Sequence, residues 1–125
     1  MQWRLYDPAN YMLVKWNRTY LFYFAADTLE WYPEWEIDLG APVAAPTNVD
    51  ALAWQGVYRR DFANGSVLVN PGTSTVSPTL AAPMQRLDPQ GGGAVPADGT
   101  PTATVASAPV TSFSLAPGSG AILLS

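Results

Sequence analysis

Residues 54–71 constrain the fold more than any other part of this chain. Residues 57–62 are rich in aromatic and β-branched side chains, which favour an extended strand. Asn64 and Gly65 come next, and both residue types accept the positive φ angles of a tight turn. A short apolar run over residues 66–70 follows, and a Pro-Gly pair ends it. The pattern predicts a β-hairpin with strands over residues 57–62 and 66–70.

The rest of the chain divides into two compositionally different halves. Fourteen of the fifteen aromatic residues lie at or before Phe62, and so do thirteen of the sixteen charged residues. After residue 72 the chain consists mainly of Ala, Pro, Thr, Ser, Gly and Val, with turn signals between short runs of strand type. These runs predict further strands over residues 73–80, 84–87, 102–106, 111–115 and 121–124.

We therefore predict an all-β fold, namely a small antiparallel β-sandwich preceded by an aromatic-rich segment. The alternative for residues 91–109 is disorder, because Gly, Pro and Ala dominate there. In the first half, residues 20–24 form a continuous apolar run, which predicts a buried strand. Residues 8–16 fit either a strand or a short helix that begins near Asn10. Residues 31–40 are expected to be extended or looped, because they contain a proline that opposes a helix.

Composition excludes several kinds of function. The chain of 125 residues has no cysteine and no histidine, so it lacks a disulfide framework, a thiolate nucleophile and an imidazole base. We expect no cofactor and no metal site. The net charge is −4 with no basic cluster, which argues against nucleic acid as a partner. No apolar run reaches the roughly 20 residues needed to span a bilayer, so no membrane partner is expected. The N-terminus has no signal-peptide pattern, and the cellular location stays open.

An acidic cluster over residues 30–38 holds the candidate catalytic residues, Glu34, Glu36 and Asp38. Glycosidases use two carboxyl groups, about 5 Å apart in retaining enzymes and roughly 6.5–9.5 Å apart in inverting ones. In an extended strand these three side chains would share one face, with neighbours about 6–7 Å apart. The alternative is that they are solvated acids beside a loop.

Aromatic residues in the same cluster are candidates for sugar contact. Trp31, Tyr32 and Trp35 could form a platform on which the apolar face of a pyranose lies, while nearby carboxylates bind its hydroxyl groups. The competing interpretation is that these rings close the core, because Trp is highly buried on average. A separate polar group lies on the first hairpin strand, where alternation places Arg59 and Asp61 on one face as an ion pair.

The hairpin sequence YRRDFANGSVLVNP also resembles a segment of a family of TIM-barrel glycoside hydrolases, where it follows the barrel and opens a C-terminal β-sandwich. The likeness extends to WEIDLGAP at residues 35–42, to MQRLDP at residues 84–89 and to the closing stretch at residues 112–124. It implies that residues 1–45 correspond to the end of a barrel and its linker, and residues 46–125 to the sandwich. The family's catalytic carboxylates are expected on earlier barrel strands, which this sequence does not contain.

These observations predict an ancillary, non-catalytic domain of a carbohydrate-active enzyme, with a polysaccharide or oligosaccharide as its partner. One alternative is a minimal glycoside hydrolase that uses the carboxylates of residues 34–38. Another is a structural β-domain that self-associates through exposed aromatics and edge strands.

Overall fold

The computed structural model describes residues 3–15, 29–99 and 101–125. In chain order the elements are α1 (Trp3–Val14), β1 (Glu30–Trp31), the 3-10 helices η1 (Pro33–Glu36) and η2 (Val49–Leu52), β2 (Ala53–Trp54), β3 (Val57–Phe62), β4 (Gly65–Asn70), β5 (Thr79–Gly91), β6 (Gly93–Ala94), β7 (Ala103–Ser112) and β8 (Ser119–Leu124). No helix within these ranges is long and apolar enough to cross a membrane.

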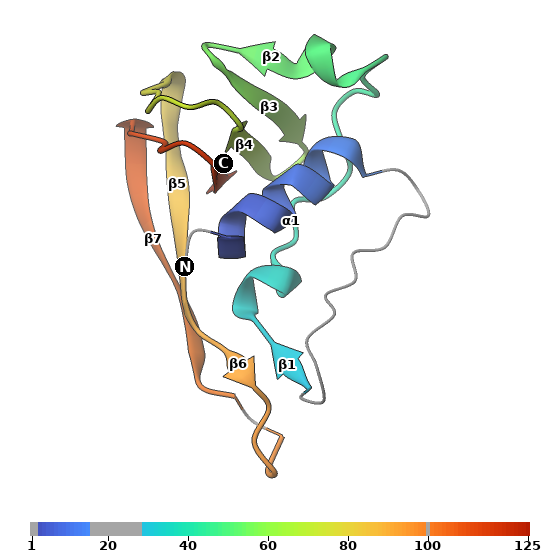
Figure 1. Ribbon diagram of the computed structural model, residues 1–125, viewed down its shortest axis with the longest axis vertical. Coiled ribbons are helices and arrows are strands. Elements are labelled where there is room, and N and C mark those ends of the chain that lie inside the picture. Colours follow the sequence, from blue (N-terminus) through green and yellow to red (C-terminus); the bar gives the residue numbers. More distant parts are fainter. Residues whose placement is uncertain (1–2, 16–28, 100) are drawn as a thin grey trace.

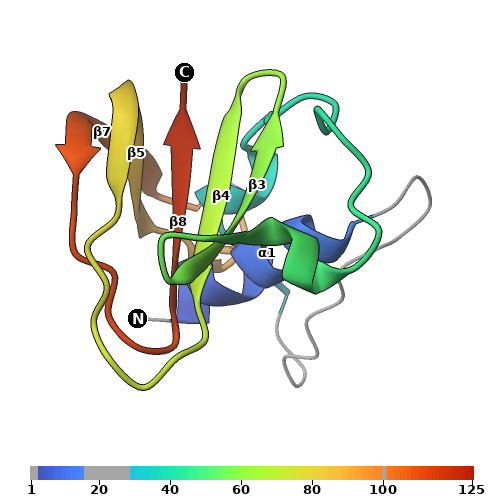
Figure 2. The same ribbon diagram turned by 90° about the horizontal axis from the view of Figure 1, so that it is seen from above.

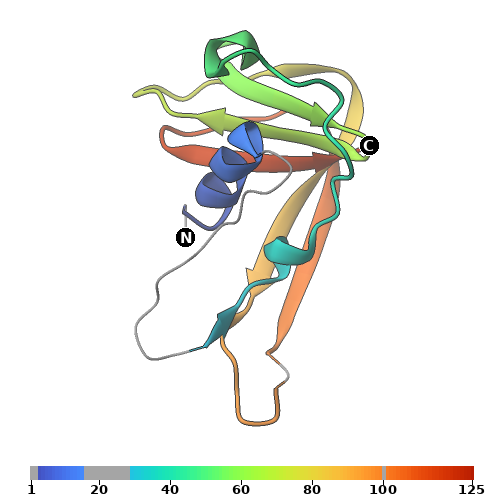
Figure 3. The ribbon, with the colours of Figure 1, turned by 90° about the vertical axis from the view of Figure 1, so that its right-hand side faces the viewer.

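The predicted antiparallel all-β fold is confirmed, with one helix added to it. The main sheet has six strands in the order β2-β3-β4-β8-β5-β7, and α1 covers one of its faces (Figures 1 and 2). A second, two-stranded sheet pairs β1 with β6. The long strands β5 and β7 extend past the rest of the sheet and lead to this small sheet at the far end of the molecule (Figure 3).

The hairpin of β3 and β4 is confirmed, but the reason for its glycine differs from the expectation. Phe62 pairs with Gly65, so Ala63 and Asn64 form the turn. Among the described residues outside glycine, only Gln55 has a positive φ, and Gly65 does not have one either. A Cβ atom on Gly65 would lie 2.0 Å from the backbone oxygen of Leu123. Glycine is therefore needed because β8 approaches closely, not because the turn is left-handed.

The second half contains fewer and longer strands than predicted. The strand expected over residues 84–87 is the middle of β5, and the one over residues 121–124 belongs to β8. The strand expected over residues 102–106 is the first part of a longer strand, β7, which β5 pairs with along nearly its whole length. The strand expected over residues 111–115 was wrong for most of its length, since β7 ends at Ser112. The expected strand over residues 73–80 was wrong for most of its length, since β5 begins only at Thr79.

The disorder alternative for residues 91–109 was also wrong for the part that the structure describes. β6 and most of β7 lie in this range, where β1 and β5 provide partners for their backbone hydrogen-bonding groups. A composition poor in large apolar residues is compatible with order here because the neighbouring strands stabilise the segment.

The N-terminal segment is a helix, so its strand alternative was wrong. α1 begins at Trp3, ahead of the expected start, and includes Pro8. The strand expected over residues 20–24 lies outside the described residues. Residues 33–36 were expected to be extended or looped, and they form a 3-10 helix instead. Pro33 is tolerated because it stands at the helix start, where its missing N–H would have no intrahelical partner.

Both faces of the main sheet are packed with apolar side chains, which makes the fold sandwich-like. On β4, Val67 and Val69 face α1, while Leu68 between them faces the other way. The cluster beneath α1 contains Ala9, Leu13, Leu39, Phe62, Val67, Val69, Leu87 and Ile122. The opposite cluster contains Val57, Leu68, Leu80, Phe113, Leu115, Ala121 and Leu123.

Two contacts hold α1 against the sheet. Gly120 of β8 lies under the helix, where an added Cβ would come within 2.6 Å of the Leu5 backbone oxygen. Arg60 of β3 is buried, and its Nη1 donates to the backbone oxygens of Met12, Leu13 and Lys15 at the end of the helix. A cation at a helix C-terminus satisfies the last carbonyls and interacts favourably with the helix dipole.

Replacing Gly120 by alanine should destabilise the protein, because the methyl group would push α1 off the sheet. We expect the free energy of unfolding, measured by urea denaturation, to fall by about 2 kcal/mol, as is usual for overpacking. Gly72→Ala is the matched control, since Gly72 is exposed and its added methyl group would meet only the Asn70 side chain. Equal losses in the two variants would contradict the close packing of α1 on β8.

Candidate functional site

The candidate site lies where β1 pairs with β6, at the end of the molecule opposite β2 (Figure 1). Three consecutive glycines, Gly91 to Gly93, have positive φ values of 76°, 80° and 108°. They turn the chain out of β5 and into β6. A Cβ on Gly92 would lie 2.7 Å from the backbone oxygen of Trp31. The glycine run therefore lets the backbone pass directly against β1.

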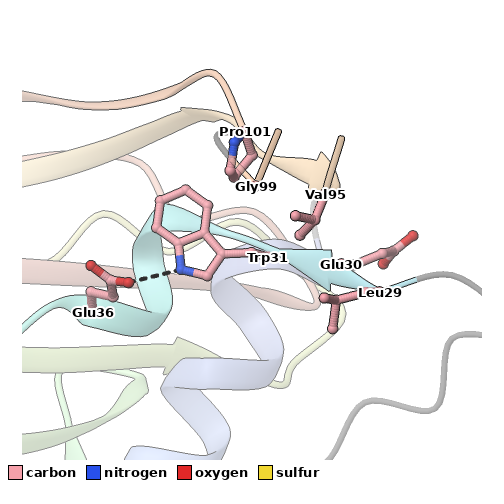
Figure 4. Close-up of a pocket in the computed structure, with 7 residues that line it drawn as sticks. All are labelled: Leu29, Glu30, Trp31, Glu36, Val95, Gly99 and Pro101. Atoms are coloured by element: carbon pink, nitrogen blue, oxygen red, sulfur yellow. Dashed lines mark hydrogen bonds between the residues drawn. The ribbon is translucent and has the colours of Figure 1, made fainter. Parts of the chain in front are cut away.

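An open pocket of about 490 Å³ lies beside this small sheet. Its walls come from β1, from the end of η1 and from the loop after β6. The lining residues are Leu29, Glu30, Trp31, Glu36, Val95, Gly99 and Pro101 (Figure 4). Most of this lining is apolar, and the polar side chains in it are the two carboxylates. Such a combination is typical of small-molecule sites, where a few polar groups orient the ligand.

Trp31 is the central side chain of this pocket. Its indole Nε1 donates a hydrogen bond of 2.8 Å to Oε1 of Glu36 (Figure 4). The indole N–H is thus used within the protein, and the hydrogen bond holds the ring in a defined orientation. The face of the ring remains as the apolar surface that a ligand could contact.

Glu34 points away from the pocket and into the protein. Its side chain is 1% exposed and accepts two hydrogen bonds of 2.8 Å from Nε and Nη2 of Arg4. This bidentate ion pair joins η1 to α1. The hydrogen bonds with Glu34 raise the pKa of the Arg4 guanidinium above its ordinary value. The arrangement gives Glu34 a structural role, because both of its oxygens are used by one buried partner.

Tyr32 is buried next to this ion pair. Its ring lies under the Arg4 guanidinium, with 4.9 Å from the Cζ atom to the ring centroid, and meets Trp35 edge-on at a centroid distance of 5.3 Å. Its hydroxyl group donates to Glu30 Oε2 at 3.2 Å. Burial, together with the charge of Glu30, raises the pKa of the phenol. Tyr32 thus supports the pocket from the interior, while Trp35 is 39% exposed.

The third predicted carboxylate, Asp38, belongs to a turn. Its Oδ1 accepts a hydrogen bond of 2.8 Å from the backbone N–H of Gly40. The expectation that Glu34, Glu36 and Asp38 share one face was wrong, because η1 is a helix and not a strand. The three carboxylates have three different partners, and of these only Glu36 lines the pocket.

Sequence reasoning missed the half of the pocket formed by Val95, Gly99 and Pro101. These residues have no chemical signature, and they lie more than sixty positions from Trp31 in the sequence. The available signal was the glycine run before β6, since consecutive glycines indicate a close backbone approach.

The second predicted polar group is confirmed as an ion pair. Nε of Arg59 lies 2.7 Å from Oδ1 of Asp61, and the guanidinium stacks 4.6 Å from the ring centroid of Trp54. Within the described ranges, no three acidic side chains come together in a way that could hold a metal ion.

The two glutamates of η1 should respond differently to the same substitution. Glu34→Gln leaves Arg4 without its buried counter-charge, and breaking such a pair costs about 3–5 kcal/mol of stability. Glu36→Gln keeps an acceptor for the exposed Trp31 hydrogen bond and should cost less than about 1 kcal/mol. Denaturant unfolding of the two variants measures both values. Similar losses would contradict a structural role that is specific to Glu34.

Comparison with known proteins identifies one family. The model of a family described as hypothetical glycosyl hydrolase family 15 matches residues 1–66, which is 66 of the 125 residues. The matched range runs from α1 to the start of β4 and contains Trp31, Glu34 and Glu36. No curated protein and no solved structure matches the chain.

Proposed function

This chain belongs to hypothetical glycosyl hydrolase family 15, and we propose that it is an ancillary, non-catalytic β-domain of a carbohydrate-active enzyme. In this proposal the domain binds a glycan weakly through the pocket beside Trp31. The family relates the chain to carbohydrate chemistry. The pocket supplies a surface that suits a sugar ring.

The observation that carries the proposal is the orientation of Trp31. An indole ring that is fixed at the edge of an open pocket can stack against the apolar face of a pyranose. The carboxylate of Glu36, held beside the indole at 2.8 Å, can accept hydrogen bonds from sugar hydroxyl groups. Trp35, which is 39% exposed on the same 3-10 helix as Glu36, offers a second aromatic surface.

Binding without catalysis is favoured by the partners of the acidic side chains. Hydrolysis of a glycosidic bond needs two carboxyl groups on either side of that bond. Of the predicted trio, Glu34 is enclosed by Arg4 and Asp38 holds a turn, so Glu36 is the member that faces the pocket.

The second carboxylate of the lining, Glu30, accepts a hydrogen bond from Tyr32, and the indole of Trp31 lies between it and Glu36 (Figure 4). In this proposal the two carboxylates hold aromatic side chains in place and do not act as a catalytic pair.

We also propose a relation to a larger enzyme. In this proposal residues 1–45 correspond to the end of a TIM barrel and its linker, and residues 46–125 to a C-terminal sandwich. The resemblance of the hairpin sequence supports this assignment. Because α1 packs on β4 and β8, the two parts would fold together as one unit despite their different origins.

Depletion of the protein by a panel of insoluble and soluble polysaccharides tests the proposed function, with reducing ends counted in the same tubes. We expect binding to at least one polysaccharide and no new reducing ends. Trp31→Ala should weaken this binding about tenfold or more, the equivalent of about 1.4 kcal/mol. Trp54→Ala is the matched control, since it removes an indole at the opposite end of the molecule (Figure 1).

Other outcomes would contradict the proposal in different ways. New reducing ends that disappear in Glu36→Gln would make the chain a hydrolase. If neither binding nor hydrolysis occurred on any polysaccharide, the carbohydrate role of this domain would be wrong, and measurement of its assembly state by light scattering would test the structural alternative. Equal binding by the parent and Trp31→Ala would place the glycan away from the pocket.

A further inference from the structure

We infer that the pocket beside Trp31 prefers glycans that carry positive charge, namely polymers that contain free amino sugars. This inference rests on the proposed function, because it specifies the class of sugar that the same pocket takes. Two carboxylates and an indole line the pocket, and the nearby Arg4 is paired with a different carboxylate, that of Glu34.

Within the part of the chain that the structure describes, the lining carries negative charge that no lysine or arginine of the lining balances. Glu30 and Glu36 are both lining residues, and none of the seven residues of the lining is a lysine or an arginine. Arg4, which lies close to this part of the chain, is 12% exposed and forms a bidentate ion pair with Glu34. Its charge is therefore already balanced inside the protein.

The two carboxylates lie on either side of the indole ring of Trp31 (Figure 4). Glu36 uses Oε1 for the indole N–H, and Glu30 uses Oε2 for the Tyr32 hydroxyl group. Each carboxylate therefore uses one of its oxygens to hold an aromatic side chain in place. Ionised carboxylates accept further hydrogen bonds, and those from an ammonium group are stronger than those from a neutral hydroxyl.

The indole itself adds to this preference. A cation that lies over the face of a tryptophan ring is attracted by the negative potential of the ring, and tryptophan is the best side chain for this interaction. An amino sugar stacked on Trp31 would bring its ammonium group close to the ring and to the Glu36 carboxylate, which is held beside the indole. A neutral sugar would gain only the stacking and ordinary hydrogen bonds.

The same features oppose acidic glycans. A uronate or sulfate group in the pocket would face Glu30 and Glu36 with no lysine or arginine among the described lining residues, and like charges placed together at an interface are strongly unfavourable. The net charge of −4 acts in the same direction, since it attracts cationic polymers and repels anionic ones at a distance.

Titration calorimetry with three oligosaccharides of equal length tests the inference. They are β-1,4-linked oligomers of glucosamine, of N-acetylglucosamine and of glucose, measured at a pH at which the amine of glucosamine is protonated. The N-acetyl oligomer is the sharpest comparison, because acetylation removes the charge and keeps the sugar skeleton. We expect the glucosamine oligomer to bind about tenfold more tightly, and added salt to reduce the difference.

Variants locate the effect in the pocket. Glu36→Gln retains an acceptor for the Trp31 indole and removes one charge, so it should reduce the ratio of glucosamine to N-acetylglucosamine affinity to about threefold or less. Asp50→Asn removes one exposed charge on η2, outside the lining, and should leave the preference unchanged.

Each contrary result has a separate meaning. Equal affinity for the glucosamine and N-acetylglucosamine oligomers would overturn the charge preference and leave the proposed glycan binding intact. Binding to none of the oligomers, nor to any polysaccharide of the depletion panel, would overturn both. A tenfold preference that persists in a Glu30→Gln, Glu36→Gln double variant would show that the charge selection arises elsewhere, and the assignment to this pocket would be wrong.

Discussion

The close packing of α1 on the main sheet is the constraint on which the rest of the structure depends. A helix of 12 residues that includes a proline is too short to be stable alone, so its stability must come from the surface it covers. Gly120 allows the backbones of α1 and β8 to approach, and Arg60 satisfies three carbonyl groups at the helix end. Burial lowers the pKa of Arg60, and the negative end of the helix dipole offsets part of that cost.

The helix in turn positions the candidate site through one buried ion pair. Arg4 of α1 forms an ion pair with Glu34 of η1. The same four-residue helix contains Glu36, whose carboxylate accepts the hydrogen bond that orients Trp31. A buried ion pair contributes little net stability compared with an apolar pair of the same size. Separating the two charges is nevertheless costly, because each would then be buried without a partner. Its value here is positional, because it selects one placement of η1 relative to the sheet.

The acidic residues between positions 30 and 38 have different roles, because some stabilise the fold and others line the pocket. Glu34 is buried against Arg4, Asp38 holds a turn, and Glu30 and Glu36 remain at the pocket. The aromatic residues divide in the same way, with Tyr32 inside and Trp31 at the pocket. A short helix separates side chains that a strand would have aligned, so Glu36 alone of the three predicted carboxylates lies at the pocket.

The sequence by itself determined the antiparallel β class, the hairpin of β3 and β4 and the Arg59–Asp61 pair, because turn residues and strand alternation act between near neighbours. Only the tertiary structure decided which acids are buried, since the partner of Glu34 lies 30 positions away on a helix whose type the local pattern left open. The tertiary structure also decided that position 65 requires glycine, because the backbone of Leu123 lies against it. It likewise formed the pocket, since the second wall belongs to the loop after β6, which is distant from β1 in the sequence. Contacts between segments that are far apart in the chain depend on how the whole sheet packs, and no local pattern records them.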